Sequence, residues 1–175
     1  MKLRKIYNQI REEQLLKEIG DRFEIPQGAT FQIHEYEGKV KFKFLDDDYL
    51  VAIRLPIKQG NQAGMTVDFI TNNDLDAKMT NKGSALKVMS YVVGSIDEWI
   101  KRYKKYYFNN DPFKLIYIKF NPKSESGEIS SEFANKRDKL YRIYINQFAS
   151  KYGSQVEYSS GGGITAKFNP KIIIK

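Results

Sequence analysis

The chain has 175 residues, a formal net charge of +8 and a pI near 9.4, and 41% of its residues are hydrophobic. This length predicts a single domain with one buried core. The chain has no cysteine and one histidine. This composition excludes a disulfide framework, thiol catalysis, a cysteine-ligated zinc site and a multi-histidine metal site, and we expect no metal. No apolar run approaches the ~20 residues of a membrane span, so we expect a soluble, cytoplasmic protein.

The first half of the chain predicts a helix followed by strands. Apolar residues recur at helical spacing through residues 1–20, and Gly20 ends that pattern. Residues 30–71 then alternate between polar and apolar with period two, which is typical of strands that bury one face. Short turns separate these segments, so we expect an antiparallel meander. Its strands are expected at 30–37, 39–45, 49–55 and 65–71, with Pro56 ending the third strand and a flexible loop at 57–64.

The second half predicts two long helices and three further strands. Residues 83–107 carry apolar side chains at alternating steps of four and three, which mark one helix face. The second long helix is expected at 130–152, and a strand at 114–121 is expected to be buried on both faces. Residues 155–168 predict two terminal strands around a glycine hairpin tip. An apolar tail at 171–175 follows and has no evident partner.

The strand at 114–121 completes the predicted topology. Strict alternation puts Leu115, Tyr117 and Lys119 on one of its faces. A strand, a helix and another strand in succession predict a parallel pair with a right-handed crossover. We therefore expect one α/β (α+β) domain over residues 1–175, with a mixed, mostly antiparallel sheet of about six strands and two long helices.

The turn before the first long helix carries a resemblance to a known family. It reads Thr80-Asn81-Lys82-Gly83-Ser84-Ala85. The pyrophosphate turn of the GCN5-related N-acetyltransferases (GNAT) has Gln or Arg, two residues, Gly, one residue and then Gly or Ala. Gly83 and Ala85 match this pattern, and Thr80 departs from it.

The second long helix and the order of elements extend the resemblance. Leu140-Tyr141 is similar to a Leu-Tyr pair of that family, whose tyrosine commonly serves as general acid to the leaving thiolate. The family's Asn seven residues ahead of this tyrosine is replaced by Ala134, and its Gly-Phe after the tyrosine is missing. The order of helices and strands between residues 30 and 168 resembles the GNAT layout, in which a splayed parallel strand follows the first long helix.

This resemblance implies an N-acyltransferase that binds acetyl-coenzyme A. The backbone N–H groups of residues 80–85 would hold the pyrophosphate, because free N–H groups at a helix start attract anions. Tyr141 would donate a proton, and Asp68 would act as a base through a water molecule. The alternatives stay open: Gly83 as an ordinary helix-start glycine, Tyr141 as a packed aromatic residue and Asp68 as a solvated strand residue.

A second resemblance concerns origin. The opening Met1 to Asn8, the turn at 80–85 followed by Val88, and the run Arg137 to Tyr141 look like small uncharacterised proteins of tailed bacteriophages, which share a GNAT-like layout. This implies a viral protein that acts in the host cytoplasm or in the virion. The alternative to the acyltransferase is therefore a non-catalytic virion-associated or host-interaction protein of the same fold.

A basic stretch at the end of the first long helix bears on that alternative. Lys101, Arg102, Lys104 and Lys105 alternate with tyrosine rings such as Tyr103, a composition that suits stacking on nucleic-acid bases. The net charge of +8 likewise favours nucleic acid or the coenzyme A pyrophosphate as an anionic partner. The other interpretation is a solvated helix end whose cations complement the C-terminal dipole. The sequence leaves both functions open.

Overall fold

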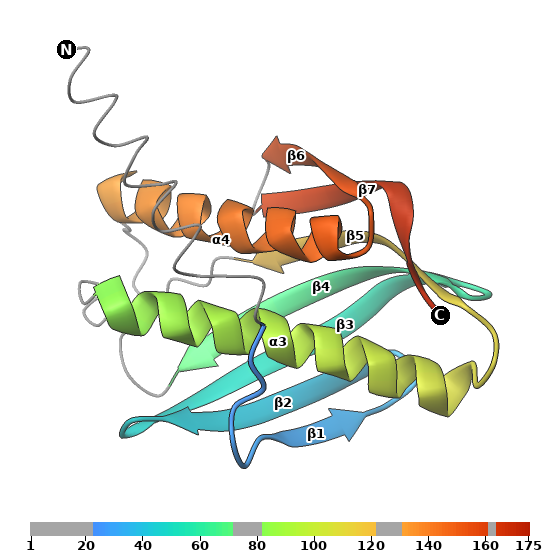
Figure 1. The fold of residues 1–175 in the computed structure, drawn as a ribbon, viewed down its shortest axis with the longest axis horizontal. Coiled ribbons are helices and arrows are strands. Elements are labelled where there is room, and N and C mark those ends of the chain that lie inside the picture. The colour runs from blue at the N-terminus through green and yellow to red at the C-terminus, as the bar shows by residue number, and fades with distance from the viewer. Residues whose placement is uncertain (1–22, 72–81, 122–130, 161–163) are drawn as a thin grey trace.

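The computed structural model describes residues 23–71, 82–121, 131–160 and 164–175. Over these residues the chain forms a seven-stranded sheet and two long helices (Figure 1), which confirms the expected α+β class. The sheet has seven strands where about six were expected, because both strands predicted within residues 155–168 join it. The predicted helix at 1–20 lies outside the described residues. The elements are β1 (Thr30–Ile33), β2 (Glu37–Phe44), β3 (Asp47–Gln59), β4 (Gln62–Thr71), α3 (Lys82–Tyr107), β5 (Phe113–Asn121), α4 (Ser131–Lys151), β6 (Gln155–Ser160) and β7 (Ile164–Ile174).

The strands follow the order β1-β2-β3-β4-β5-β7-β6 across the sheet. β4 and β5 pair in parallel and are joined through α3, as predicted, while the other neighbours pair antiparallel. A parallel pair needs a long crossover, and the 26-residue α3 supplies it. The mixed, mostly antiparallel sheet is therefore confirmed.

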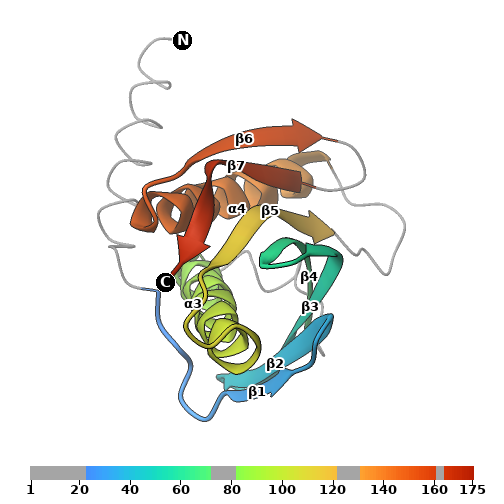
Figure 2. The same ribbon diagram turned by 90° about the vertical axis from the view of Figure 1, so that its right-hand side faces the viewer.

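Both helices lie against the same face of the curved sheet, and the views in Figures 1 and 2 agree on this. The strands alternate accordingly: on β2, Val40 and Phe42 are buried beneath α3 and Lys39 and Lys41 are exposed. No described helix covers the second face, which we call the open face. Its residues include Lys39, Lys41 and Lys43 on β2, Ala52 and Arg54 on β3, Gly64, Thr66 and Asp68 on β4, Tyr117 and Lys119 on β5, and Thr165 and Lys167 on β7.

Trp99 anchors α3 to the first two strands. Its side chain is fully buried, and its Nε1 donates a hydrogen bond to the backbone oxygen of Gln32 at 3.0 Å. The indole lies directly on Gly38, where a Cβ atom would be only 2.1 Å from Nε1. One turn later, the buried Tyr103 donates its hydroxyl to the backbone oxygen of Glu35 at 2.8 Å. These contacts need a strand position without a side chain, which explains the glycine in β2.

The meander differs from the prediction at its ends. β1 stops at Ile33, because the chain turns at 34–36 before β2 begins at Glu37. β3 continues past Pro56, so the prediction that this proline ends the strand is wrong. The β3/β4 register shifts between Arg54 and Ile57, and such a bulge accommodates a residue without an N–H donor. The expected loop at 57–64 is consequently a tight hairpin between β3 and β4.

The apolar tail also differs from the prediction, because it has a partner. β7 runs from Ile164 to Ile174, and its last residues pair with the start of β5: Phe113 lies opposite Ile174, and Leu115 lies opposite Ile172. Ile172 is 0% exposed and Ile174 is 3% exposed, so both side chains belong to the core.

A buried carboxylate joins α3 to the end of α4. Asp97 is 5% exposed and lies 2.8 Å from Lys101 Nζ and 2.6 Å from Lys151 Nζ, and Tyr152 donates its hydroxyl to it. Burial acts to raise the pKa of Asp97, but the hydrogen bonds from Lys101, Lys151 and Tyr152 outweigh burial and lower that pKa. Asp97 is therefore ionised and paired at neutral pH.

Candidate functional site

The predicted pyrophosphate turn lies at the start of α3. Thr80 and Asn81 are outside the described residues, and the helix begins at Lys82, so residues 82–85 form its first turn. The backbone N–H groups of a first helical turn have no partner within the helix, which is the feature that a pyrophosphate turn requires.

The strands beside this turn stay paired. The β4/β5 ladder runs from Gln62 opposite Lys114 to Asp68 opposite Asn121, with one register shift between Ala63 and Gly64. Asn121 is the last residue of β5. The GNAT resemblance implies a splayed parallel strand, and along this ladder β4 and β5 do not separate.

The two residues predicted to be catalytic lie on opposite faces of the sheet. Tyr141 on α4 is 8% exposed and stacks on Phe120, with ring centroids 4.9 Å apart, on the helix-covered face. Asp68 belongs to the open face, where Arg54 Nη2 lies 2.6 Å from its Oδ2 atom. Its side chain is 5% exposed, so it is not the solvated residue of the alternative interpretation either. The structure does not bring Tyr141 and Asp68 together, as shared acid–base work on one substrate requires.

Most side chains of the basic stretch at the end of α3 are buried or already have partners. Tyr103, whose ring was expected to stack on bases, is fully buried. Lys101 pairs with Asp97, and Arg102 Nε lies 2.7 Å from Glu98 Oε1, so both cations already have acidic partners. Lys104 Nζ donates to the backbone oxygen of Asn109 at 2.5 Å, while Lys105 is exposed.

Cations gather instead on the open face. They come from four strands, and local sequence alternation indicates only the exposed basic side of β2. Acidic side chains are fewer there, and two of them, Asp48 and Asp68, already pair with Lys43 and Arg54. Register and burial place on this face the cations Lys39, Lys41, Lys43, Arg54, Lys114, Lys119, Lys167 and Lys171 and the carboxylates Glu37, Asp48, Asp68 and Glu157.

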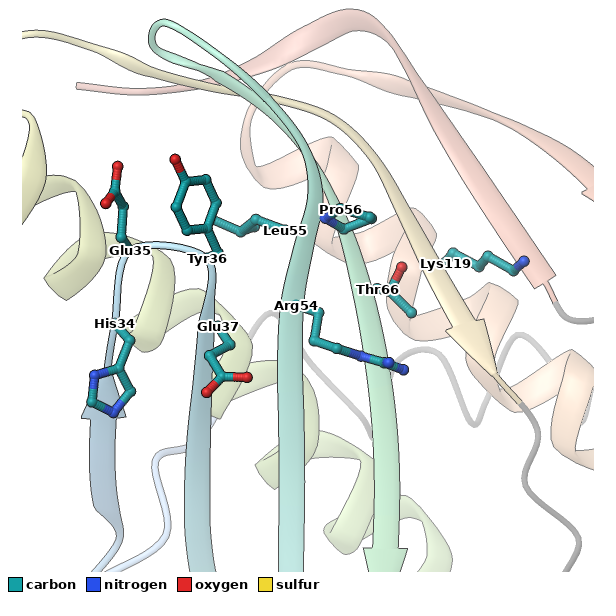
Figure 3. Close-up of a pocket in the computed structure, with 9 residues that line it drawn as sticks. All are labelled: His34, Glu35, Tyr36, Glu37, Arg54, Leu55, Pro56, Thr66 and Lys119. Carbon is teal, nitrogen blue, oxygen red and sulfur yellow. The ribbon is translucent and has the colours of Figure 1, made fainter.

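A shallow depression of about 680 Å³ lies on this face beside the β1–β2 turn. Figure 3 shows that Arg54, Thr66 and Lys119 line it from three neighbouring strands, and His34 lies at its other side. Thr66 lies opposite Arg54 in one ladder and opposite Lys119 in the next. The depression therefore continues the line of cations across the middle of the sheet.

Tyr117 carries an aromatic ring in the middle of this surface, and Tyr36 carries a second one beside the depression. A Cβ atom placed on Gly64 would lie 2.2 Å from Cε1 and Cζ of Tyr117, so the ring rests directly on the backbone of β4. Burial raises the pKa of the Tyr117 phenol, which therefore stays neutral at physiological pH. Strict alternation placed Tyr117 on the same face as Leu115. The register shift between these two residues instead sends Leu115 into the core and leaves Tyr117 and Lys119 on the open face.

Comparison of the chain with protein-family models, with curated proteins and with solved structures finds no match. Within the described ranges, neither helix is long and apolar enough to cross a membrane. In the same part of the chain, His, Asp and Glu side chains form no group of three that would hold a metal ion.

Proposed function

We propose that this protein is a non-catalytic binding protein whose open face takes an anionic polymer. One observation carries the proposal: eight cations and four carboxylates occupy a sheet face that no described helix covers. Two of these carboxylates are already paired with cations of the same face. A surface with surplus positive charge attracts polyanions and accelerates their association.

The arrangement of the cations supports a polymer rather than a small anion. Lys39 and Lys41 stand on β2, Arg54 on β3, Lys119 on β5 and Lys167 on β7. Four steps between neighbouring strands separate β2 from β7, which gives a track of roughly 19 Å at the usual strand spacing. Charges spread over such a length suit a chain of anionic groups.

Retention on a heparin column tests this proposal. The double variant Lys39→Gln/Lys41→Gln is expected to elute at lower salt than the wild type, because both side chains are exposed on the open face. The matched control is Lys104→Gln/Lys105→Gln, which removes the same charge from the end of α3. If the wild type is not retained at low salt, or if only the α3 variant elutes earlier, the proposal is wrong.

A second candidate function is acyl-coenzyme A binding on a GNAT-like layout. The observation in its favour is the single parallel pair β4/β5, joined through a long helix whose first turn contains Lys82 and Gly83 of the predicted turn. The separation of Tyr141 from Asp68 argues for binding without that acid–base pair. The viral origin and a role in the host cytoplasm or virion belong to both proposals and rest on the sequence resemblance.

Thermal unfolding with acetyl-coenzyme A tests the second candidate. A ligand that binds only the folded state raises the free energy of unfolding by RT ln(1 + [L]/Kd) and so raises Tm. The variant Gly83→Val is expected to abolish the shift, because a branched side chain obstructs close approach to the first helical turn. An unchanged Tm at millimolar acetyl-coenzyme A would refute this candidate.

A further inference from the structure

We propose that the polymer bound by the open face is a single-stranded nucleic acid, and that one of its bases stacks on Tyr117. This inference rests on the proposed function and adds the chemical class of the ligand and the residue that recognises it. It starts from the position of the Tyr117 ring, which rests on Gly64 in the middle of the open face.

The ring is held in place before any ligand arrives. Its Cε1 and Cζ atoms contact β4 where Gly64 has no side chain, and the side chain stays partly exposed. An aromatic ring that is already immobilised loses little conformational freedom on binding, and a base stacked on such a ring contributes about 1–3 kcal/mol. Tyr117 therefore has the position and the chemistry of a stacking residue.

Cations flank the ring where a nucleic-acid backbone would need them. Lys167 lies directly opposite Tyr117 in the β5/β7 ladder, and Lys119 follows two residues later on the same face. Directly opposite residues have Cα atoms about 4.5–5.5 Å apart, and same-face neighbours along a strand are about 6.6 Å apart. Both ammonium groups can therefore reach phosphates next to a base that lies on the ring.

The ring distinguishes single strands from other polyanions. Bases in a duplex are stacked on one another and paired, so only an unpaired strand can place a base on Tyr117. Heparin and inorganic polyphosphate have no bases and gain only the electrostatic part. An acidic protein segment lacks both the base and the regular phosphate spacing. Tyr117 should then affect oligonucleotide affinity and leave heparin retention unchanged.

Fluorescence anisotropy with a labelled oligo(dT) tests the inference, with the full chain at low salt. Tyr117→Leu is expected to weaken binding by about 5- to 150-fold, the range that corresponds to one stacked base. Tyr117→Phe keeps the ring and should bind like the wild type. Lys119→Gln/Lys167→Gln should weaken oligo(dT) binding and reduce the slope of log K against log salt by about 1.4, since single strands lose ~0.7 per phosphate contact.

The outcomes separate this inference from the proposed function. If Tyr117→Leu binds oligo(dT) like the wild type, or if a duplex of equal length binds as tightly as oligo(dT), the stacking inference is overturned, while heparin retention still supports the polyanion surface. If the wild type binds neither heparin nor oligo(dT), both proposals fail.

Should Tyr117→Leu not fold, photocrosslinking of 5-iodouridine-labelled RNA to the wild type decides the question. A crosslink at Tyr117 supports the inference. A crosslink confined to Tyr36 and Tyr106, which are exposed in the described part of the chain, overturns it.

Discussion

Replacing Gly38 by alanine is expected to destabilise the fold through Trp99. A Cβ atom at this position would lie 2.1 Å from Nε1, about 1.3 Å short of ordinary van der Waals contact, which begins at 3.4 Å. The indole is fully buried and cannot move without disturbing its neighbours. One such neighbour is Tyr103, which stacks on it with ring centroids 4.9 Å apart.

The size of the effect follows from three contributions. Overpacking of a filled core costs about 1–3 kcal/mol. Displacement of the indole also breaks its 3.0 Å hydrogen bond to Gln32, worth about 1 kcal/mol. Alanine restricts the unfolded chain more than glycine does, which returns about 0.4–1 kcal/mol. The net loss is about 1–4 kcal/mol. Each kcal/mol lowers Tm by about 2–4 °C in a domain of this size.

Urea unfolding followed by tryptophan fluorescence measures this effect directly, because the chain has one tryptophan. Gly38→Ala should lower the unfolding midpoint and shift the native emission to longer wavelength. Lys39→Ala, whose side chain points away from the core, is the control and should leave the emission unchanged. In a Trp99→Leu background, followed by circular dichroism, Gly38→Ala should cost less. A Gly38→Ala variant with wild-type stability and emission would refute this description of the site.

Three further predictions concern other parts of the fold. Because the pKa of Asp97 is lowered in the folded state, its contribution to stability is present at neutral pH and is lost as pH falls below about 4. Between pH 7 and pH 3, the urea midpoint of Asp97→Asn should therefore fall less than that of the wild type. Burial raises the pKa of Tyr158 to about 12, so this phenol stabilises the fold below pH ~10 and that contribution is lost as pH rises further. The difference in ultraviolet absorbance between the wild type and Tyr158→Phe should show its late ionisation, and an unshifted titration would contradict the burial. Ile172→Ala should lower the free energy of unfolding, measured with denaturant, by about 2–5 kcal/mol, because the Ile172 side chain is fully buried. Ile173→Ala on the same strand should lower it far less, because Ile173 is 44% exposed. Equal losses would contradict the pairing of β7 with β5.

Local periodicity was enough to predict most of the elements. The alternation of Val40 and Phe42 with lysines gave the buried and exposed sides of β2 correctly. The steps of four and three predict the buried face of α3, which includes Trp99. Each of these elements buries one face in the core, so its apolar residues recur at the spacing that brings them onto that face. Such a pattern can be read within one short segment of sequence.

Local patterns do not predict the register shifts between strands. Near Pro56 in β3 and at Ile116 in β5, an extra residue changes the phase of the alternation, so residues that look equivalent by spacing lie on opposite faces. The partner of the tail at Ile172 lies more than fifty residues earlier in the chain, and no local signal marks such a pairing.

The candidate site was predictable to a smaller degree than the fold. Turn and tyrosine motifs pointed to residues 80–85 and Tyr141, but the sequence did not show that Tyr141 and Asp68 are on opposite sides of the sheet. The ion pair of Asp68 with Arg54 and the contact of Tyr117 with Gly64 depend on which strands become neighbours. The surface around Tyr117 is formed by β4, β5 and β7 together, and no local pattern predicts that these strands are neighbours.

The arrangement of both helices on one side of the sheet also has an evolutionary consequence. Alternate residues of β2 serve different ends, since Val40 and Phe42 maintain the fold and Lys39 and Lys41 face the solvent. Exposed positions tolerate substitution with little loss of stability, whereas buried ones do not. Substitutions at the exposed positions can therefore change which partner is bound, while the buried positions keep the residues that the fold requires. In saturation mutagenesis along β2, substitutions at the buried positions should lower protein abundance. Substitutions at the exposed positions should change binding and leave abundance unaffected.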